Sequence, residues 1–261
     1  MNKDTLRYIS IAERPGGFGV EFHNRGYELF GMNRVYIPLR VRPNELEAVI
    51  RLVKDNFQGC SVSMPHKINV REFLDSFDNS AINCEAVNTI IKQKNGKLKG
   101  YNTDYNGARR AIEERINIED KKVLMLGAGG VARAIGKAVV DLGGRLTISN
   151  RTKEKSTELA KKLGTSLVEY KELEKVDGCL LINATSIGMN NIKEIPFSVG
   201  LLEKFEAVMD VVVRETKLIS KAKELEKIVI PSRLMTVYQA AKQFELYTRK
   251  ELPEEFLRGF L

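Results

Sequence analysis

The segment Val123 to Ala134 contains residue types that suit the binding of a dinucleotide phosphate. Apolar residues typical of a buried strand lead into three glycines, Gly127, Gly129 and Gly130, and then into a helical pattern. Without Cβ atoms, these glycines let a pyrophosphate approach the backbone amides at the helix N-terminus, where the helix dipole favours negative charge. An ordinary tight turn is the alternative interpretation. The predicted phosphate-binding residues are Gly127, Ala128, Gly129, Gly130, Val131 and Ala132.

The next expected strand, residues 145–149, ends in a polar and basic turn. A site selective for NAD usually has an aspartate or glutamate here, which holds the ribose hydroxyls. This chain has Asn150 and then Arg151, whose guanidinium can contact a 2′-phosphate through two hydrogen bonds. Thr152 follows, and Lys155, one helical turn later, adds a second positive charge. The pattern therefore predicts NADP as the cofactor, with a solvated basic turn as the alternative.

Two charged residues in the first half of the chain suit proton transfer. Lys67 follows Pro65, which is expected to begin a helix, and a lysine in a first turn faces the positive end of the helix dipole. Asp104 lies at a second expected helix start. Together, a lysine and an aspartate can bind a hydroxyl and carry its proton while a nicotinamide removes the hydride. The alternatives are a solvated surface lysine and an aspartate that only caps a helix.

Elements that would position these residues alternate between strands and helices along the chain, which indicates an α/β fold with two domains and a boundary near Asp104. A cleft is expected between the domains. The expected strands cover residues 7–12, 35–40, 59–63, 86–92 and 98–102, and later strands end near Asn183, Asp210 and Ile230. Helices are expected over residues 43–53, 104–116 and 234–249.

The composition is that of a globular enzyme rather than a fibrous, membrane or disulfide-rich protein. The chain has 261 residues, 43% of them hydrophobic, which is enough for two ordinary domains. Its formal charge is +8, but the lysines and arginines are interspersed with aspartates and glutamates along the chain. We therefore expect anionic small ligands and no nucleic-acid partner. Three cysteines without metal or disulfide spacing and only two histidines predict buried free thiols and no metal. Without a signal peptide or a long apolar run, we expect a cytoplasmic protein without membrane contact.

Seven motifs in one order resemble those of the shikimate dehydrogenase family, and the resemblance covers nearly the whole chain. In that family, a substrate domain completed by the C-terminal helix accompanies a Rossmann-type NADP domain. The resemblance implies a substrate domain over residues 1–103 and 234–261 and an NADP domain over residues 104–233. The motifs are Ser63 to Lys67, Glu85 to Thr89, Tyr101 to Asp104, Gly127 to Gly130, Asn150 to Thr152, Asn183 to Met189 and the helix with Gln239.

The resemblance also implies roles for matching residues. Lys67 and Asp104 would form the catalytic pair, and Asn88 and Gln239 would hydrogen-bond to substrate hydroxyls. The nicotinamide side would be lined by Asn183, Ala184 and Thr185, with Met189 nearby. The implied reaction is reversible hydride transfer between shikimate and 3-dehydroshikimate, or a close cyclic polyol acid, in a monomer or homodimer. The alternatives are a quinate-type dehydrogenase and a dinucleotide-binding sensor with little catalysis.

The chain departs from the family where the substrate carboxylate should bind. Typical members have a Ser-x-Ser-Pro segment before a His-Asn pair. Here His23 and Asn24 are preceded by Gly16 to Val20, which are expected to form a short loop. Ser10 or Arg14 could hold the carboxylate instead. Ser61 replaces an asparagine that the family places in the sugar-ring pocket, and Ser63 joins the predicted substrate-binding residues. These differences resemble the paralogous, shikimate dehydrogenase-like branch.

Overall fold

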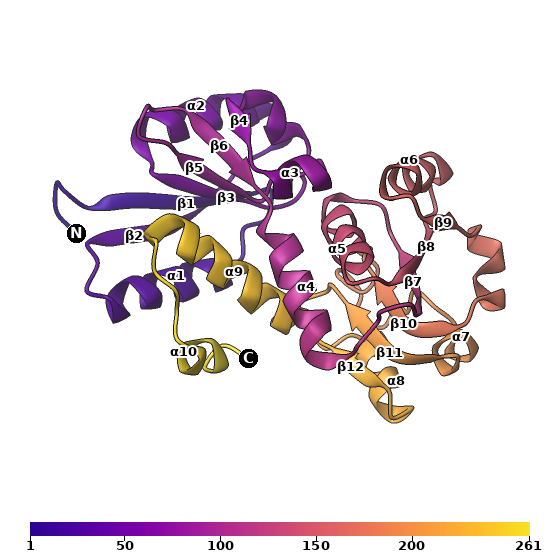
Figure 1. Cartoon of the computed structure of the whole chain (residues 1–261). Helices are drawn as coiled ribbons and strands as arrows, with labels where there is room; N and C mark the ends of the chain where they lie inside the picture. Colours follow the sequence, from indigo (N-terminus) through magenta and orange to yellow (C-terminus); the bar gives the residue numbers. More distant parts are fainter. The chain divides into compact units, whose positions relative to one another are not determined.

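The computed structural model describes residues 1–261 and contains two compact units (Figure 1). Unit 1 comprises Met1–Thr103 and Val237–Leu261, and unit 2 comprises Asp104–Thr236. The chain leaves unit 1 at the start of α4 (Thr103–Arg115) and re-enters it within α9 (Ser232–Thr248). The short helix α10 (Glu254–Arg258) then completes unit 1. The predicted α/β class and the return of the C-terminal helix to the first domain are confirmed.

Unit 1 is built on a six-stranded mixed sheet with the order β2-β1-β3-β5-β6-β4. β1 pairs in parallel with β2 and β3, whereas β5 is antiparallel to both β3 and β6. Its strands are β1 (Leu6–Ala12), β2 (Arg34–Arg40), β3 (Gly59–Val62), β4 (Ser76–Phe77), β5 (Thr89–Lys92) and β6 (Leu98–Tyr101). Its other helices are α1 (Phe18–Leu29), α2 (Leu46–Asn56) and α3 (Asn79–Cys84), with 3-10 turns η1 (Pro43–Glu45) and η2 (Asn69–Phe73).

The two faces of this sheet differ in chemistry because successive strand residues point to opposite sides. Ile9 and Ile11 of β1 join the apolar core beneath α2, whereas Tyr8 packs against Tyr247 of α9 with ring centroids 4.8 Å apart. Figure 1 shows α2 on one side of the sheet and α1 and α9 on the other. A Cβ at Gly59 would lie 2.5 Å from the Tyr247 ring, so glycine permits this close approach. The face toward α9 is therefore aromatic and hydroxyl-bearing.

Unit 2 contains a six-stranded sheet in which every pairing is parallel, with the order β12-β11-β10-β7-β8-β9. The order reverses between β7 and β10, as in dinucleotide-binding folds, and ligands of such sheets bind at the carboxyl ends beside that point. The strands are β7 (Lys122–Leu126), β8 (Arg145–Ser149), β9 (Ser166–Leu167), β10 (Gly178–Asn183), β11 (Phe205–Asp210) and β12 (Ile228–Ile230). Helices are α5 (Gly130–Asp141), α6 (Lys153–Leu163), α7 (Val199–Glu203) and α8 (Lys217–Glu224), with the 3-10 turn η3 (Tyr170–Lys175).

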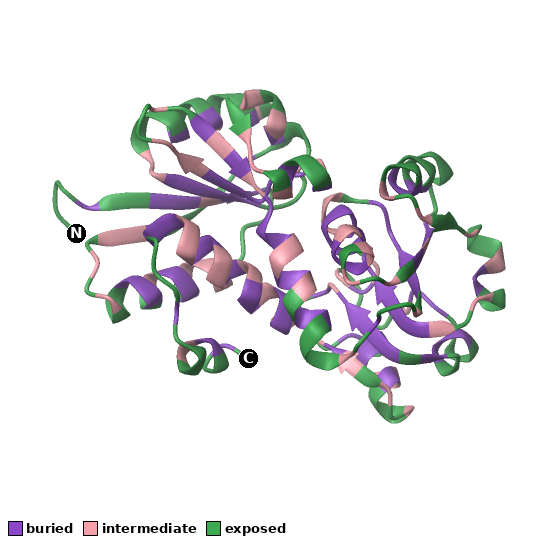
Figure 2. Cartoon of the chain, viewed as in Figure 1, coloured by how far each residue is buried: buried purple, intermediate pink, exposed green.

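Burial follows these elements in both units, since the strands are largely buried and the outer helix faces are exposed (Figure 2). The loop expected over Gly16 to Val20 is confirmed only for Gly16 and Gly17, because α1 begins at Phe18 and includes His23 and Asn24. Phe22 and Tyr27 on the buried face of this helix stabilise it against the α9 side of unit 1. All three cysteines are buried and free, as predicted. None of the helices has both the length and the apolar character needed to cross a membrane.

Candidate functional site

Lys67 lies in a turn rather than in the α-helix predicted to begin at Pro65. The 3-10 turn η2 starts only at Asn69. The reason is that the Lys67 carbonyl accepts a hydrogen bond from the Val87 amide at 2.7 Å, so this carbonyl is bonded to the segment before β5 and not within a helix. Lys67 is therefore not in the first turn of a helix, and no helix dipole acts on it. Its backbone is instead fixed next to the residue that precedes Asn88.

Asn88 is the centre of a buried polar cluster in unit 1, with only 2% of its surface exposed. Its Oδ1 accepts hydrogen bonds from the Thr103 amide at 2.7 Å and from the Thr89 hydroxyl at 2.8 Å. Its Nδ2 donates to the Thr103 hydroxyl at 3.0 Å and to Gln239 Oε1 at 3.5 Å. The fold thus brings Asn88 and Gln239 together, although they are far apart in the sequence.

The predicted carboxylate-binding residues differ in their surroundings. Ser61 is 8% exposed, and its hydroxyl contacts Gln243 Oε1 at 3.2 Å and the Tyr247 hydroxyl at 2.9 Å. Ser10 is half-buried on the same side of the sheet. Burial raises the pKa of Tyr36, and hydrogen bonds with Ser61 and Ser10 only partly oppose this effect. Arg14 and Ser63, in contrast, lie on exposed segments after β1 and β3.

Asp104 is the second residue of α4 and belongs to unit 2, whereas Lys67 belongs to unit 1. Because the helix begins at Thr103, Asp104 lies inside the first turn and does not occupy the capping position. Its side chain is buried, with 5% exposure. A carboxylate in a first turn is stabilised by the positive end of the helix dipole.

The glycine turn of unit 2 follows β7 and forms a cradle at the point where the strand order reverses. Gly127 has φ 124°, and a Cβ there would lie 2.6 Å from the Ala184 carbonyl oxygen, so this position requires glycine. Gly129 precedes α5, and no side chain caps the helix. A Cβ at Gly129 would meet no atom within 4 Å. This open space at an uncapped helix start fits a phosphate group.

The turn after β8 carries the cations predicted to select the cofactor. The Asn150 side chain donates to the Thr152 carbonyl at 2.9 Å and closes the turn. Arg151 and Lys155 are exposed, and neither forms an ion pair with a carboxylate of this chain. Lys153, between them, is neutralised by Glu169 at 2.9 Å. Two cations of this turn are therefore available to an anionic ligand.

A third polar cluster lies at the carboxyl ends of β10 and β11. Asn183 Oδ1 accepts hydrogen bonds from the amide and hydroxyl of Thr185, and Asn183 Nδ2 donates to Asp210 at 3.0 Å. Asp210 also accepts from the Thr216 hydroxyl at 2.7 Å. Burial raises the pKa of Asp210, against the lowering effect of these hydrogen bonds. This network fixes the loop that begins at Ala184 and continues to the half-buried Met189.

Sequence reasoning did not assign a role to Asp210 or to Gln243. Asp210 ends a parallel strand at the carboxyl edge of the sheet, where ligands of this fold bind. Gln243 lies four residues after Gln239 and therefore on the same face of α9. These two positional signals were present in the sequence, but each needs the fold to give it meaning.

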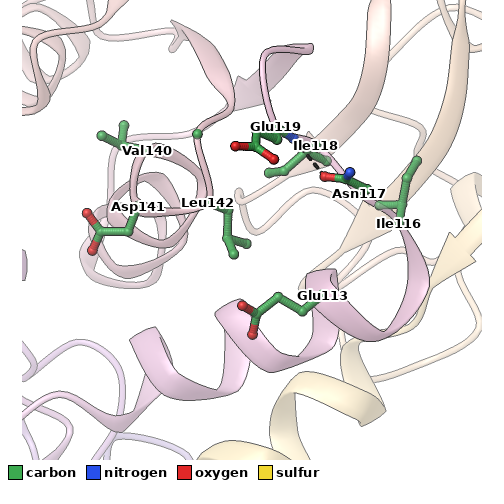
Figure 3. Close-up of a pocket in the computed structure, with 9 residues that line it drawn as sticks. Glu113, Ile116, Asn117, Ile118, Glu119, Val140, Asp141 and Leu142 are labelled. Atoms are coloured by element: carbon green, nitrogen blue, oxygen red, sulfur yellow. Dashed lines mark hydrogen bonds between the residues drawn. The ribbon is translucent and has the colours of Figure 1, made fainter.

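Unit 2 also has a pocket of about 520 Å³ at the opposite edge of its sheet (Figure 3). The pocket carries carboxylates, among which Glu113 pairs with Arg109 and Asp141 accepts a hydrogen bond from Tyr105 at 2.8 Å. An acidic pocket at the amino ends of the strands does not suit an anionic dinucleotide. Its lining residues are Glu113, Ile116, Asn117, Ile118, Glu119, Val140, Asp141, Leu142 and Gly143.

Comparisons with known proteins agree with this division into two sites. Residues 18–90 match the model of the shikimate dehydrogenase substrate binding domain, and residues 108–189 match that of shikimate / quinate 5-dehydrogenase. The NADP(+) shikimate dehydrogenase of Aquifex aeolicus is 34% identical, covering 89% of this chain and 87% of that protein. A shikimate dehydrogenase-like protein of Haemophilus influenzae is 35% identical, covering 98% and 96%. A crystal structure of shikimate dehydrogenase in complex with NADP+ superposes with a TM-score of 0.90 at 34% identity, covering 100% and 96% of the two chains.

Proposed function

Because this chain belongs to the shikimate dehydrogenase family, we propose that it is an NADP-dependent oxidoreductase acting on shikimate or a close cyclic polyol acid. In the proposed reaction, shikimate and NADP+ give 3-dehydroshikimate, NADPH and a proton, and the reaction is reversible. The observation that carries the proposal is the buried cluster of Asn88, Thr103 and Gln239. It supplies amide and hydroxyl groups in unit 1, while unit 2 supplies the glycine cradle and the unpaired cations.

The residues that would hold NADP are those of the cradle and of the turn after β8. The uncapped start of α5 would bind the pyrophosphate through backbone amides, and Arg151 with Lys155 would bind the 2′-phosphate. Asn183, Ala184, Thr185 and Met189 would line the nicotinamide side. When bound, NADP accepts or returns the hydride at C4 of its nicotinamide. This assignment agrees with the NADP+ named for similar proteins.

Proton transfer in the proposed reaction is assigned to Lys67 and Asp104. The Lys67 amine would take the proton of the reacting hydroxyl in one direction and return it in the other. The Asp104 carboxylate would accept a hydrogen bond from the same hydroxyl and so orient it. Asn88 and Gln239 would hold neighbouring hydroxyls of the ring. In this mechanism the protein itself contributes positioning and proton transfer.

The proposed substrate is tested by steady-state assays of NADP reduction with shikimate and quinate side by side at several pH values. Faster turnover of quinate would assign the chain to the quinate-type alternative. Tight NADPH binding without turnover of any cyclic polyol acid would contradict an enzymatic role and favour the sensor. Reduction of NADP by shikimate at the higher kcat/KM supports the proposal.

The role of Lys67 is tested by Lys67→Met, which keeps the length of the side chain but removes its amine. We expect kcat to fall by ~10²–10⁴, because a general acid-base group contributes about this factor, and the Kd of NADP to change little. Lys94→Met is the matched control, since Lys94 is an exposed lysine of the turn between β5 and β6. Full turnover by the Lys67 variant would exclude Lys67 as the proton carrier.

A further inference from the structure

Gln243 is a buried residue of α9 whose side-chain amide has partners on both of its ends. Only 4% of it is exposed. Its Nε2 donates to the Asn88 carbonyl at 3.2 Å and to the Thr89 hydroxyl at 2.9 Å. Its Oε1 lies 3.2 Å from the Ser61 hydroxyl and 3.4 Å from His23 Nε2. Gln243 therefore joins α9 and α1 to β3 and to the start of β5, which Asn88 immediately precedes.

The direction of these hydrogen bonds follows from the chemistry of the groups. A backbone carbonyl can only accept, so the amide of Gln243 must present Nε2 to the Asn88 carbonyl and Oε1 to Ser61 and His23. The Thr89 hydroxyl then accepts from Gln243 and uses its own proton to donate to Asn88 Oδ1 at 2.8 Å. A directional relay thus runs from Gln243 through Thr89 to Asn88.

This relay and the Thr103 amide together determine which end of the Asn88 side chain faces Gln239. Oδ1 accepts hydrogen bonds from the Thr89 hydroxyl, the Thr103 amide and, at 3.2 Å, the Thr103 hydroxyl, and is held on their side. Nδ2 is consequently directed toward Thr103 Oγ1 and Gln239 Oε1. In a flipped Asn88, the N–H groups of Nδ2 would face the N–H of Thr103, so that donors would oppose each other with a large electrostatic penalty. The side chain of Asn88 therefore presents an N–H donor on the side of Gln239.

We propose that Gln243 is a positioning residue that fixes the amide orientation of Asn88, so that Asn88 offers a hydrogen-bond donor to a substrate hydroxyl. The inference rests on the proposed function, because it assigns Gln243 to the binding of the same polyol substrate. It adds a specificity rule for that site. The group on the substrate next to Asn88 must be able to accept a hydrogen bond, as a hydroxyl or a carbonyl can and an ammonium cannot.

His23 holds the other end of the Gln243 amide. Complete burial lowers the pKa of His23 to about 3, so the ring is neutral near pH 7. Because Gln243 Oε1 can only accept, the ring proton lies on Nε2. The ring is itself fixed by stacking on Tyr36, with centroids 4.4 Å apart. The orientation of Gln243 is therefore anchored by an aromatic ring as well as by the sheet.

The relay is tested with two variants that interrupt it at different points. Gln243→Met removes the donor Nε2 and the acceptor Oε1 while keeping the length of the side chain, and Thr89→Val removes the hydroxyl while keeping the shape of the side chain. In both we expect the KM for shikimate to rise about tenfold, with kcat within about twofold and the Kd of NADP unchanged. Thr248→Val is the matched control on α9, since that buried hydroxyl donates to the Phe244 carbonyl and does not reach Asn88. Its KM should equal that of the parent chain.

A double-variant cycle separates action through Asn88 from a general effect on stability. If Gln243 acts through Asn88, Gln243→Met should cause no further rise in KM in an Asn88→Ala chain. Additive effects, or an unchanged KM in folded Gln243→Met and Thr89→Val chains, would overturn the proposal. The amide orientation is also measurable without turnover, from NMR contacts of the Asn88 Nδ2 protons to Thr103. Loss of these contacts in the variants supports the relay even if shikimate proves not to be the substrate, and their persistence would refute it.

Discussion

Replacement of Arg151 by alanine should convert a strong preference for NADP into a weak one. Arg151 is exposed at the turn after β8 and has no carboxylate partner in the chain, so its guanidinium need not break an existing ion pair to bind a phosphate. A hydrogen bond to a charged group contributes about 1.5–3 kcal/mol. Because 1.4 kcal/mol corresponds to about a tenfold change, we expect Arg151→Ala to raise the Kd of NADP by roughly 10- to 150-fold.

The same substitution should leave the Kd of NAD within about twofold, since NAD has no 2′-phosphate for the guanidinium to contact. Both constants are measured by fluorescence titration with the reduced cofactors, at low and at high salt. The difference between the parent and the variant should shrink at high salt, because salt screens exposed charges. Equal losses of affinity for both cofactors would refute the assignment of Arg151 to the 2′-phosphate.

Lys153→Ala is the matched control for this experiment. Lys153 belongs to the same basic turn, but its ammonium lies 2.9 Å from Glu169. The hydrogen bonds of Glu169 with Lys153 and Lys171 lower the pKa of its carboxyl, so Glu169 stays ionised at neutral pH. We therefore expect Lys153→Ala to change NADP affinity much less than Arg151→Ala. An equal effect would mean that total charge, rather than a specific phosphate contact, determines the preference.

Two further predictions concern unit 1. The double substitution Gly17→Ser and Gly19→Ser should lower the KM for shikimate if missing hydroxyls limit carboxylate binding. Both positions have room for a side chain, because a Cβ at Gly17 would meet no atom within 4 Å and a Cβ at Gly19 would lie 3.4 Å from the Tyr36 ring. An unchanged KM in the folded variant would mean that another group already binds the acid. Stability should depend on pH through His23, whose pKa of about 3 in the folded state lies below its ordinary value of 6.5. Between pH 6.5 and pH 3 the unfolded chain binds more protons at His23 than the folded chain does. The free energy of unfolding is therefore unaffected by His23 above pH 6.5 and decreases as the pH falls toward 3, by up to about 1.4 kcal/mol per pH unit. Urea unfolding at pH 7 and pH 5 should show a smaller loss for His23→Phe than for the parent, and equal losses would contradict the prediction.

The sequence predicted the elements whose patterns are local. The apolar strand before Gly127 and the helix after it are both present, and the helix with Gln239 returns to the first unit as expected. In these segments, hydrophobic periodicity and glycine chemistry act within a few residues, so no knowledge of distant contacts is needed. The family motifs then predicted which of the many polar residues belong to the substrate and cofactor sites.

Local reasoning failed where tertiary contacts decide the structure. Lys67 is not in a helix because its carbonyl bonds to Val87, twenty positions along the chain. Phe18 to Val20 form the first turn of α1 directly after two glycines, because aromatic residues such as Phe22 pack against the C-terminal part of unit 1. Gln243 was missed for the same reason, since its partner Asn88 comes from the other end of this unit. In each case the deciding contact joins residues whose proximity cannot be read from local periodicity.

The internal hydrogen bonds of unit 1 also indicate which groups can recognise a substrate carboxylate. If Ser61 turned to a carboxylate, it would withdraw its proton from Gln243 Oε1 and leave a buried amide oxygen with one donor fewer, at a cost of about 1–3 kcal/mol. Ser10 is similarly engaged with the Tyr36 hydroxyl. Arg14 carries no such cost, since it is exposed and has no carboxylate partner in the chain. We therefore infer that Arg14 is the best candidate for binding the acid, and that Ser10 and Ser61 act mainly by keeping the α9 side of the sheet in place beneath Asn88.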